Sequence, residues 1–361
     1  MDELYIGVMS GTSLDGIDIA LCEIKGESFE LLNSEEYSFD EELKADILTT
    51  INGPTTLKTI GELDTRLGHL YANAINTFIL TKKIKHRRIR AIGLHGQTLW
   101  HEPNSKNPFS MQLGNANVIT VQTGVSVVSD FRQKDIALGG QGAPFAPAFH
   151  QFLFNRLDER VAVLNIGGMA NLSILGDELR GYDTGCGNIL MDYWISEKKG
   201  LAYDKDGKWA STGRIHQKLL KTMLYDPYFL QKPPKSTGRE YFSPKWLEEQ
   251  LQDFIALKDE DIQATLLELT AHSIANEVKK TSTELLIVCG GGLKNIQLMK
   301  QLKKEINGVE VVSSDECGES SEFMEAMAFA WLAYKRVHKE KVKLSSVTGA
   351  MEDSILGAIY E

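Results

Sequence analysis

The chain has 361 residues, of which 42% are hydrophobic and 24% are charged, and its mean hydropathy is −0.20. This length predicts two lobes or two domains, and the composition excludes a disordered or coiled-coil protein. The net charge of −10 argues against general binding to nucleic acid or to an anionic membrane surface. The acidic N-terminus does not look like a secretory signal, no apolar run is long enough to span a membrane, and the four cysteines are scattered. We therefore expect a soluble cytoplasmic protein.

The first part of the chain predicts a β-meander followed by helices. Apolar runs broken by glycine indicate antiparallel strands at residues 4–9, 17–24 and 28–32. Apolar residues that recur three and four positions apart indicate helices, and a buried strand follows them. These elements lie at residues 41–51 and 59–84 for the helices and 89–96 for the strand.

The middle of the chain repeats this outline. Residues 161–176 predict a strand, a glycine turn and a second strand, and a third strand follows at 179–185. The remaining elements are helices at 188–200, 261–280, 294–306 and 321–337 and a strand at 285–292. This duplication predicts two α/β lobes with a cleft between them. We expect the first lobe over 1–125, rejoined by 342–361, and the second over 126–341, with a glycine- and proline-rich junction at 132–149.

Three glycine turns allow the backbone to approach a ligand closely. They comprise Ser10, Gly11, Thr12, Ser13, Asp15 and Gly16 in the first hairpin, Asn165, Gly167 and Gly168 in the second, and Gly290, Gly291 and Gly292 after a strand. Taken singly, each turn could be purely structural. None matches a P-loop or a dinucleotide-binding glycine motif.

The order of these turns is similar to that in the actin, Hsp70 and sugar-kinase superfamily, where two hairpins grip the ATP phosphates. Within it, the chain resembles the anhydro-N-acetylmuramic acid kinase family from about residue 5 to its end. The stretches that carry the resemblance are MSGTSLDGID, GLHGQT, DFRQKDIALGGQGAP, LNIGGMAN, GYDTGCGN, PKSTGRE and CGGG. The resemblance implies a two-lobed actin-like ATPase fold, of the ribonuclease H-like α/β class, with the active site in the cleft between the lobes.

The resemblance also implies an activity and its cofactors. The family consumes 1,6-anhydro-N-acetylmuramic acid, ATP and water and releases the 6-phosphate sugar and ADP, in cytoplasmic cell-wall recycling. ATP would lie on the three glycine turns, and a homodimer is the family's expected assembly. Met9 stands where the superfamily's first turn usually carries an aspartate near Mg²⁺. We therefore expect no metal ligand from the protein and Mg²⁺ held by phosphates and waters.

Asp183 is the candidate catalytic residue. It lies at the end of a predicted strand between glycines, where a carboxylate can face a cleft, although an Asx-turn or a helix N-cap would use the same residue. The resemblance implies that Asp183 is the catalytic base. Because O6 of a 1,6-anhydro sugar carries no proton, the base would deprotonate a water that attacks C1, and the freed O6 would take the γ-phosphate.

Three residues are expected to bind the sugar: Thr98, Arg132 and Glu325. Arg132 suits the lactyl carboxylate, with a solvated charge pair as the alternative. Glu325 could instead be a surface carboxylate stabilised at a helix start, and the role of His95 is left open. Lys235, with Ser236 and Thr237, looks like a loop near the nucleotide or a polar surface loop.

Three rival functions remain at this point. A hydrolase would use Asp183 and Glu325 as paired carboxylates without ATP. A non-catalytic actin relative would use ATP as a conformational switch, and an ordinary hexose kinase would phosphorylate a free 6-hydroxyl group. Cys186 departs from the proline that the family carries, which puts the rigidity of the turn after Asp183 in question.

Overall fold

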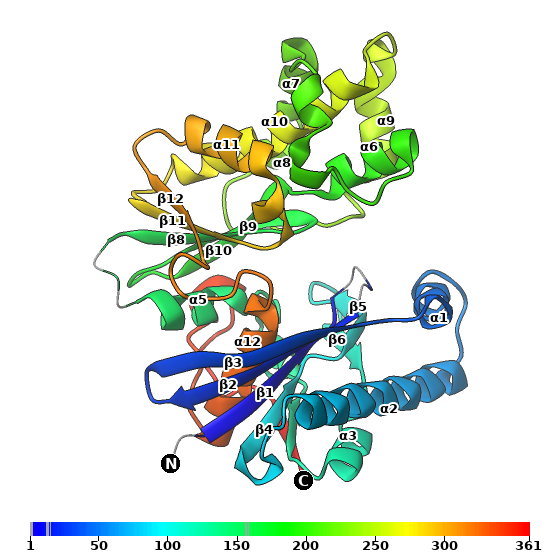
Figure 1. Cartoon of the computed structure of the whole chain (residues 1–361), viewed down its shortest axis with the longest axis vertical. Helices are drawn as coiled ribbons and strands as arrows, with labels where there is room; N and C mark the ends of the chain where they lie inside the picture. Colours follow the sequence, from blue (N-terminus) through cyan, green and yellow to red (C-terminus); the bar gives the residue numbers. More distant parts are fainter. Residues whose placement is uncertain (1–2, 12–13, 15, 156, 158) are drawn as a thin grey trace. The chain divides into compact units, whose positions relative to one another are not determined.

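Two α/β units make up the chain in the computed structural model, which describes residues 3–11, 14, 16–155, 157 and 159–361 (Figure 1). Unit 1 comprises Met1–Leu153 and Phe323–Glu361, and unit 2 comprises Phe154–Glu322. Each unit has a central sheet with its own hydrophobic core.

The sheet of unit 1 has the strand order β13-β7-β4-β1-β2-β3. Strands β1, β2 and β3 form an antiparallel meander, whereas β4 runs parallel to β1 and β7 runs parallel to β4. The strands of this sheet are β1 (Glu3–Met9), β2 (Gly16–Lys25), β3 (Ser28–Ser38), β4 (Ile89–Leu94), β7 (Val127–Ser129) and β13 (Ala358–Tyr360). Strands β5 (Gln97–Glu102) and β6 (Phe109–Leu113) form a separate two-stranded sheet. The helices are α1 (Glu41–Asn52), α2 (Leu57–Thr81), η1 (His86–Arg88), α3 (Ala116–Thr123), α4 (Arg132–Ala137), α5 (Ala146–Phe154), α12 (Met324–Val337) and α13 (Ser345–Thr348).

The sheet of unit 2 has the strand order β10-β9-β8-β11-β12. Its strands are β8 (Val161–Ile166), β9 (Met169–Ile174), β10 (Arg180–Cys186), β11 (Leu285–Cys289) and β12 (Glu310–Ser313). Its helices are α6 (Ile189–Lys199), η2 (Lys205–Gly207), η3 (Ala210–Thr212), α7 (Gln217–Leu224), α8 (Pro227–Leu230), α9 (Pro244–Leu251), η4 (Gln252–Phe254), α10 (Asp259–Val278), η5 (Gly291–Lys294) and α11 (Ile296–Glu305). Most of α10 is buried in this core.

The two units share one topology. In unit 2, β8, β9 and β10 form an antiparallel meander, and β11 and β12 extend the sheet in parallel from β8. The order β3-β2-β1-β4-β7 of unit 1 therefore has the same connectivity as β10-β9-β8-β11-β12 of unit 2. The duplicated α/β architecture expected from the sequence is confirmed.

The observed division differs from the expected boundaries. The break near residue 125 falls inside unit 1, because β7 pairs with β4, and the chain passes to unit 2 only after Leu153. Unit 1 also regains the chain at Phe323 rather than at 342. The reason is α12, which packs on β1 and β4 where Gly7 and Gly93 have no side chain. A Cβ on Gly7 would lie 1.8 Å from Ala326 O, and a Cβ on Gly93 would lie 2.0 Å from Phe329 O.

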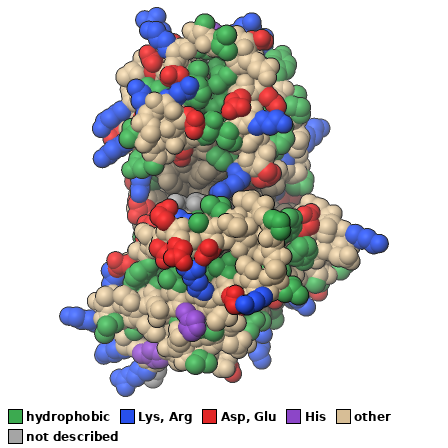
Figure 2. Space-filling model, turned by 90° about the vertical axis from the view of Figure 1, so that its right-hand side faces the viewer, with side chains coloured by type: hydrophobic (Ala, Val, Ile, Leu, Met, Phe, Trp, Pro, Cys, Tyr) green, Lys and Arg blue, Asp and Glu red, His purple; other side chains and the backbone are tan. Residues whose placement is uncertain are grey.

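The surface agrees with the charge argument. On the face that Figure 2 shows, Lys and Arg side chains are interspersed with Asp and Glu side chains rather than gathered into a basic patch. Within the described ranges, none of the helices combines the length and apolar character needed to span a bilayer.

Candidate active site

The second hairpin turn lies at one end of the unit 2 sheet, against the start of α6. Gly187 N–H donates to Gly168 O at 2.8 Å, and Asn188 N–H donates to Gly167 O at 2.8 Å. Asn188 Nδ2 also donates to Ile166 O at 3.3 Å. The turn after Asp183 is thereby fixed against the hairpin turn. Asn188 was not among the residues predicted for the site, although it closes the stretch GYDTGCGN.

The third glycine turn meets the second. Gly290 has a φ of +83°, and a Cβ there would lie 2.2 Å from Asn165 Oδ1. A Cβ on Gly292 would lie 2.3 Å from Ile166 Cγ2. Glycine is therefore required for β11 to end this close to β8. The structure brings Asn165, Gly167, Gly168 and residues 290–292 to one end of the unit 2 sheet.

The first hairpin turn belongs to unit 1. Ser10 is buried, and its hydroxyl donates to Gly96 O at 3.2 Å and lies 2.6 Å from the Tyr71 hydroxyl. The Ser10 hydroxyl group is therefore hydrogen-bonded within unit 1. Gly16 begins β2, and a Cβ there would lie 2.3 Å from Tyr37 O. The predicted residues Thr12, Ser13 and Asp15 lie outside the described residues.

Asp183 lies on β10, the edge strand of the unit 2 sheet, opposite Asn171 of β9. Its Oδ2 atom accepts hydrogen bonds from Thr237 N–H at 2.9 Å and from Ser236 Oγ at 3.1 Å. Burial raises the pKa of Asp183, and these two hydrogen bonds oppose that rise. The carboxylate does not cap α6, whose N-cap residue is Asn188. Asp183 is therefore a held, partly desolvated carboxylate in the middle of an edge strand, next to a register shift between Asp183 and Gly185, and not at the strand end that the sequence predicted.

The segment 235–237 is only in part the polar surface loop that was one of the two interpretations, because Ser236 is exposed but Lys235 is not. Lys235 is buried and its Nζ atom donates to Glu277 Oε1 at 2.8 Å, so it is neither a free surface charge nor a free phosphate ligand. Ser236 and Thr237 contact Asp183. Glu277 was missed by sequence reasoning, although an acidic residue on the buried face of a predicted helix was a usable signal.

The residues predicted to bind sugar lie in unit 1. Arg132 Nη1 donates to Gly142 O at 2.7 Å, and Arg132 Nη2 donates to His95 Nε2 at 2.7 Å. His95 must therefore carry its proton on Nδ1, which donates to Ser10 O at 3.2 Å. Burial and the charge of Arg132 lower the pKa of His95 to about 3, so this imidazole is neutral.

Arg132 and Glu325 influence each other electrostatically. Burial lowers the pKa of Arg132 to about 10, and the charge of Glu325 opposes this shift. Glu325 lies in the first turn of α12 and is exposed. Partial desolvation by the surrounding atoms raises its pKa, and the charge of Arg132 opposes that rise. Thr98 Oγ1, on β5, accepts a hydrogen bond from Gln112 Nε2 at 3.2 Å. His95 thus joins the predicted set as the partner that orients Arg132.

One group of possible metal ligands occurs among the described residues, and it is not at the glycine turns. Glu268 and His272 of α10 and Glu305 of α11 bring ligand atoms within 4.8 Å of one another. Lys279 Nζ lies 3.8 Å from Glu305 Oε2 and competes with a cation there. At the first turn, Met9 offers only a thioether, which is a poor ligand for Mg²⁺.

Two solved structures align with most of the chain at low identity. The activator of the 2-hydroxyisocaproyl-CoA dehydratase from Clostridium difficile, with bound ADPNP, is 12% identical, with 93% of this chain and 96% of that chain covered and a TM-score of 0.47. A ROK family glucokinase from Streptomyces griseus, in complex with glucose and AMPPNP, is 14% identical, with 92% and 99% covered and a TM-score of 0.40.

Sequence relatives are much closer. The anhydro-N-acetylmuramic acid kinase of Sulfurimonas denitrificans is 65% identical over 100% of both chains. Those of a Sulfurovum species and of Pasteurella multocida are 54% and 48% identical, over 99% of this chain and 99% and 96% of the relatives. A family model described as anhydro-N-acetylmuramic acid kinase matches residues 3–361. With this match over almost its entire length, the chain belongs to the anhydro-N-acetylmuramic acid kinase family.

Proposed function

We propose that this chain is an ATP-dependent sugar kinase that converts 1,6-anhydro-N-acetylmuramic acid, ATP and water to N-acetylmuramic acid 6-phosphate and ADP in peptidoglycan recycling. The family match over residues 3–361 is the observation that carries the substrate and the reaction. The held carboxylate of Asp183 supports the mechanism.

Asp183 is the base that activates water. The water oxygen attacks C1 of the sugar while its proton passes to Asp183. The C1–O6 bond breaks, and its electron pair stays on O6. O6 then attacks the γ-phosphorus of ATP, and the bond from that phosphorus to the β–γ bridging oxygen breaks to release ADP. Attack opposite the leaving O6 inverts the configuration at C1.

Backbone groups of the three glycine turns hold the ATP phosphates. The proposed residues are Ser10, Gly11, Thr12, Ser13, Asp15 and Gly16, with Asn165, Gly167 and Gly168, and with Gly290, Gly291 and Gly292. Support comes from the two turns at one end of the unit 2 sheet, where Gly290 and Gly292 pack closely against Asn165 and Ile166 while Gly167, Gly168 and Gly291 leave open space beside their backbone. Bare backbone N–H groups stabilise the charge of the transferring phosphoryl group.

Arg132 binds the lactyl carboxylate of the sugar, and Thr98 and Glu325 contact its polar groups. The Arg132 side chain is oriented by His95 and Gly142 before any ligand arrives, which lowers the ordering cost of binding. Mg²⁺ arrives with ATP and is held by phosphates and waters, because Met9 is a poor ligand for it. The protein acts in the cytoplasm as a homodimer.

Measuring ADP release with and without sugars, and ring opening of the anhydro sugar with and without ATP, separates this proposal from its rivals. We expect release with 1,6-anhydro-N-acetylmuramic acid and little with glucose or N-acetylglucosamine. Faster release with a free 6-hydroxyl sugar would indicate an ordinary hexose kinase. Release that no sugar changes would indicate an ATP switch, and ring opening without ATP would indicate a hydrolase.

A further inference from the structure

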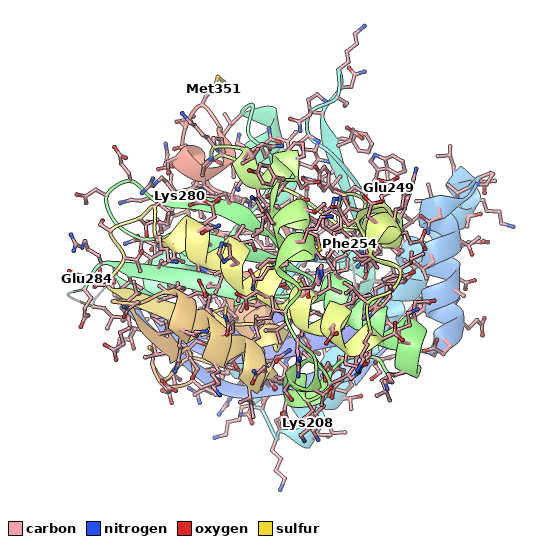
Figure 3. All side chains as sticks on the ribbon, turned by 90° about the horizontal axis from the view of Figure 1, so that it is seen from above. Lys208, Glu249, Phe254, Lys280, Glu284 and Met351 are labelled. Atoms are coloured by element: carbon pink, nitrogen blue, oxygen red, sulfur yellow. The ribbon has the colours of Figure 1, made fainter. Side chains whose placement is uncertain are left out.

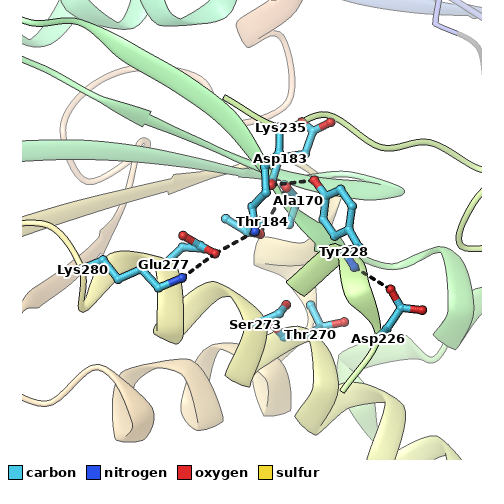
Figure 4. Close-up of polar contacts among 10 residues, drawn as sticks. All are labelled: Ala170, Asp183, Thr184, Asp226, Tyr228, Lys235, Thr270, Ser273, Glu277 and Lys280. Atoms are coloured by element: carbon cyan, nitrogen blue, oxygen red, sulfur yellow. Dashed lines mark hydrogen bonds and ion pairs between the residues drawn. The ribbon is translucent and has the colours of Figure 1, made fainter. Parts of the chain in front are cut away.

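A buried ion pair lies close to Asp183 in unit 2 (Figure 4). Lys235 Nζ donates to Glu277 Oε1 at 2.8 Å, and the two side chains are 0% and 3% exposed. Lys235 Nζ also lies 5.0 Å from the centre of the Tyr228 ring. Charged groups are seldom buried this completely, and removing one partner leaves an uncompensated charge. The pair ties the Lys235 side chain to Glu277 of α10.

The backbone links this ion pair to Asp183. Asp183 N–H donates to Lys235 O at 3.1 Å, and the Tyr228 hydroxyl donates to Asp183 O at 2.8 Å. The next two residues, Ser236 and Thr237, supply the donors to the Asp183 carboxylate. One short segment therefore has the buried charge at one end and both carboxylate donors at the other.

Both donors contact the same carboxylate oxygen. Ser236 Oγ and Thr237 N–H each donate to Asp183 Oδ2, and no donor to Oδ1 is found in the described parts of the chain. This arrangement fixes the plane of the carboxylate and leaves Oδ1 as the atom that can take a proton. Because a misplacement of about 1 Å can reduce a rate by roughly 100-fold, the placement of residues 236 and 237 matters for a base.

We propose that Lys235 and Glu277 are positioning residues for Asp183, which hold segment 235–237 so that Oδ2 is bonded and Oδ1 faces the water to be deprotonated. This inference rests on the proposed role of Asp183 as catalytic base. A buried ion pair often stabilises a protein no more than apolar residues of similar size do. The charge of Lys235 also lowers the pKa of Asp183 directly, and the further contribution that we assign to the pair is the geometry of the segment.

A double variant tests the proposal without leaving a buried charge unpaired. In Lys235→Met/Glu277→Met, apolar side chains of similar length replace both charges, so the fold is retained. We expect kcat to fall about tenfold or more, while the KM values for ATP and sugar change less than about twofold. The acid limb of the kcat–pH profile should move to higher pH, since weaker hydrogen bonds to Oδ2 and the loss of the Lys235 charge both favour the protonated carboxyl group. The fall in kcat on the pH plateau, where Asp183 is ionised in both proteins, is therefore the readout specific to positioning.

Lys280→Met is the matched control. Lys280, which follows the end of α10, donates from Nζ to the same Glu277 Oε1 atom at 3.0 Å (Figure 3). Its side chain, however, is 55% exposed. We expect this variant to keep wild-type kcat and the wild-type pH profile. An equal shift in Lys280→Met would show that any charge near Glu277 acts alike and would overturn the positioning role.

Asp183→Asn, measured in parallel, separates this inference from the proposed function. Wild-type activity in Asp183→Asn would refute the base itself. Loss of activity in Asp183→Asn, together with wild-type kcat and pH profile in the folded double variant, would refute only the positioning role. A lower folded fraction of the double variant with an unchanged pH profile would show a purely structural pair and would also overturn it.

Discussion

Asp183 shows how a carboxylate can be both held and basic. Burial raises its pKa, while hydrogen bonds from Thr237 and Ser236 lower it. The net effect is a pKa above the ordinary aspartate value, so this carboxylate is more basic than an exposed aspartate. The two donors differ in kind, because one is a main-chain N–H group and the other is a hydroxyl group that a substitution can remove.

Ser236→Ala removes one donor and leaves the other. We expect the pKa of Asp183 to rise, so that the acid limb of the kcat/KM–pH profile moves to higher pH. Activity should fall several-fold on that limb and recover at higher pH, where the carboxylate is ionised in both proteins. A uniform loss at every pH would mean that Ser236 acts in some other way.

At the scale of elements, substitutions in the glycine turns can distinguish a role in ligand binding from a role in packing. A Cβ on Gly168 would meet only Ile189 Cβ at 4.0 Å, so the turn has room for a methyl group. We expect Gly168→Ala to unfold at the wild-type urea concentration but to raise KM for ATP about tenfold or more, because the methyl group displaces a phosphate. Unchanged KM for ATP would place the nucleotide elsewhere.

Gly290→Ala, in the third glycine turn, is the contrasting variant. Its φ of +83° with a ψ of 171°, a combination almost restricted to glycine, and the 2.2 Å approach to Asn165 Oδ1 should destabilise unit 2 by more than the roughly 1–3 kcal/mol of the backbone strain alone. Urea unfolding measures this loss. Equal stability of the two variants would contradict the packing argument.

The elements with strong periodicity were predictable, and those set by distant contacts were not. The strands at residues 4–9 and 161–166 and the long helix at 261–280 followed from local pattern. The hairpin of β5 and β6 was missed because its residues mix polar and aromatic side chains without a clear alternation. The place of α12 in unit 1 depends on Gly7 and Gly93, which lie more than 200 residues away in sequence.

The candidate site divides in the same way. Asp183 and the second and third glycine turns carry signals in their own short motifs, and the structure places all three in the unit 2 sheet or at its strand ends. The hydrogen bonds of Arg132 to His95 and of Lys235 to Glu277 join segments that no local pattern connects. Partners of this kind follow only from the fold.

At the scale of the whole molecule, the central claim is that ring opening and phosphoryl transfer are one coupled reaction. Water is a reactant in this scheme, and its oxygen must end on C1 of the sugar. Phosphorylation of a free hydroxyl group would add no oxygen from water to the sugar.

The most direct test is to incubate the protein with Mg-ATP and 1,6-anhydro-N-acetylmuramic acid in ¹⁸O-labelled water and to follow ADP and sugar by mass spectrometry during early turnover. The account predicts one labelled oxygen at C1 for each ADP formed, and loss of both products in Asp183→Asn. Sugar 6-phosphate without label at C1, or labelled sugar without phosphate, would contradict the coupled mechanism.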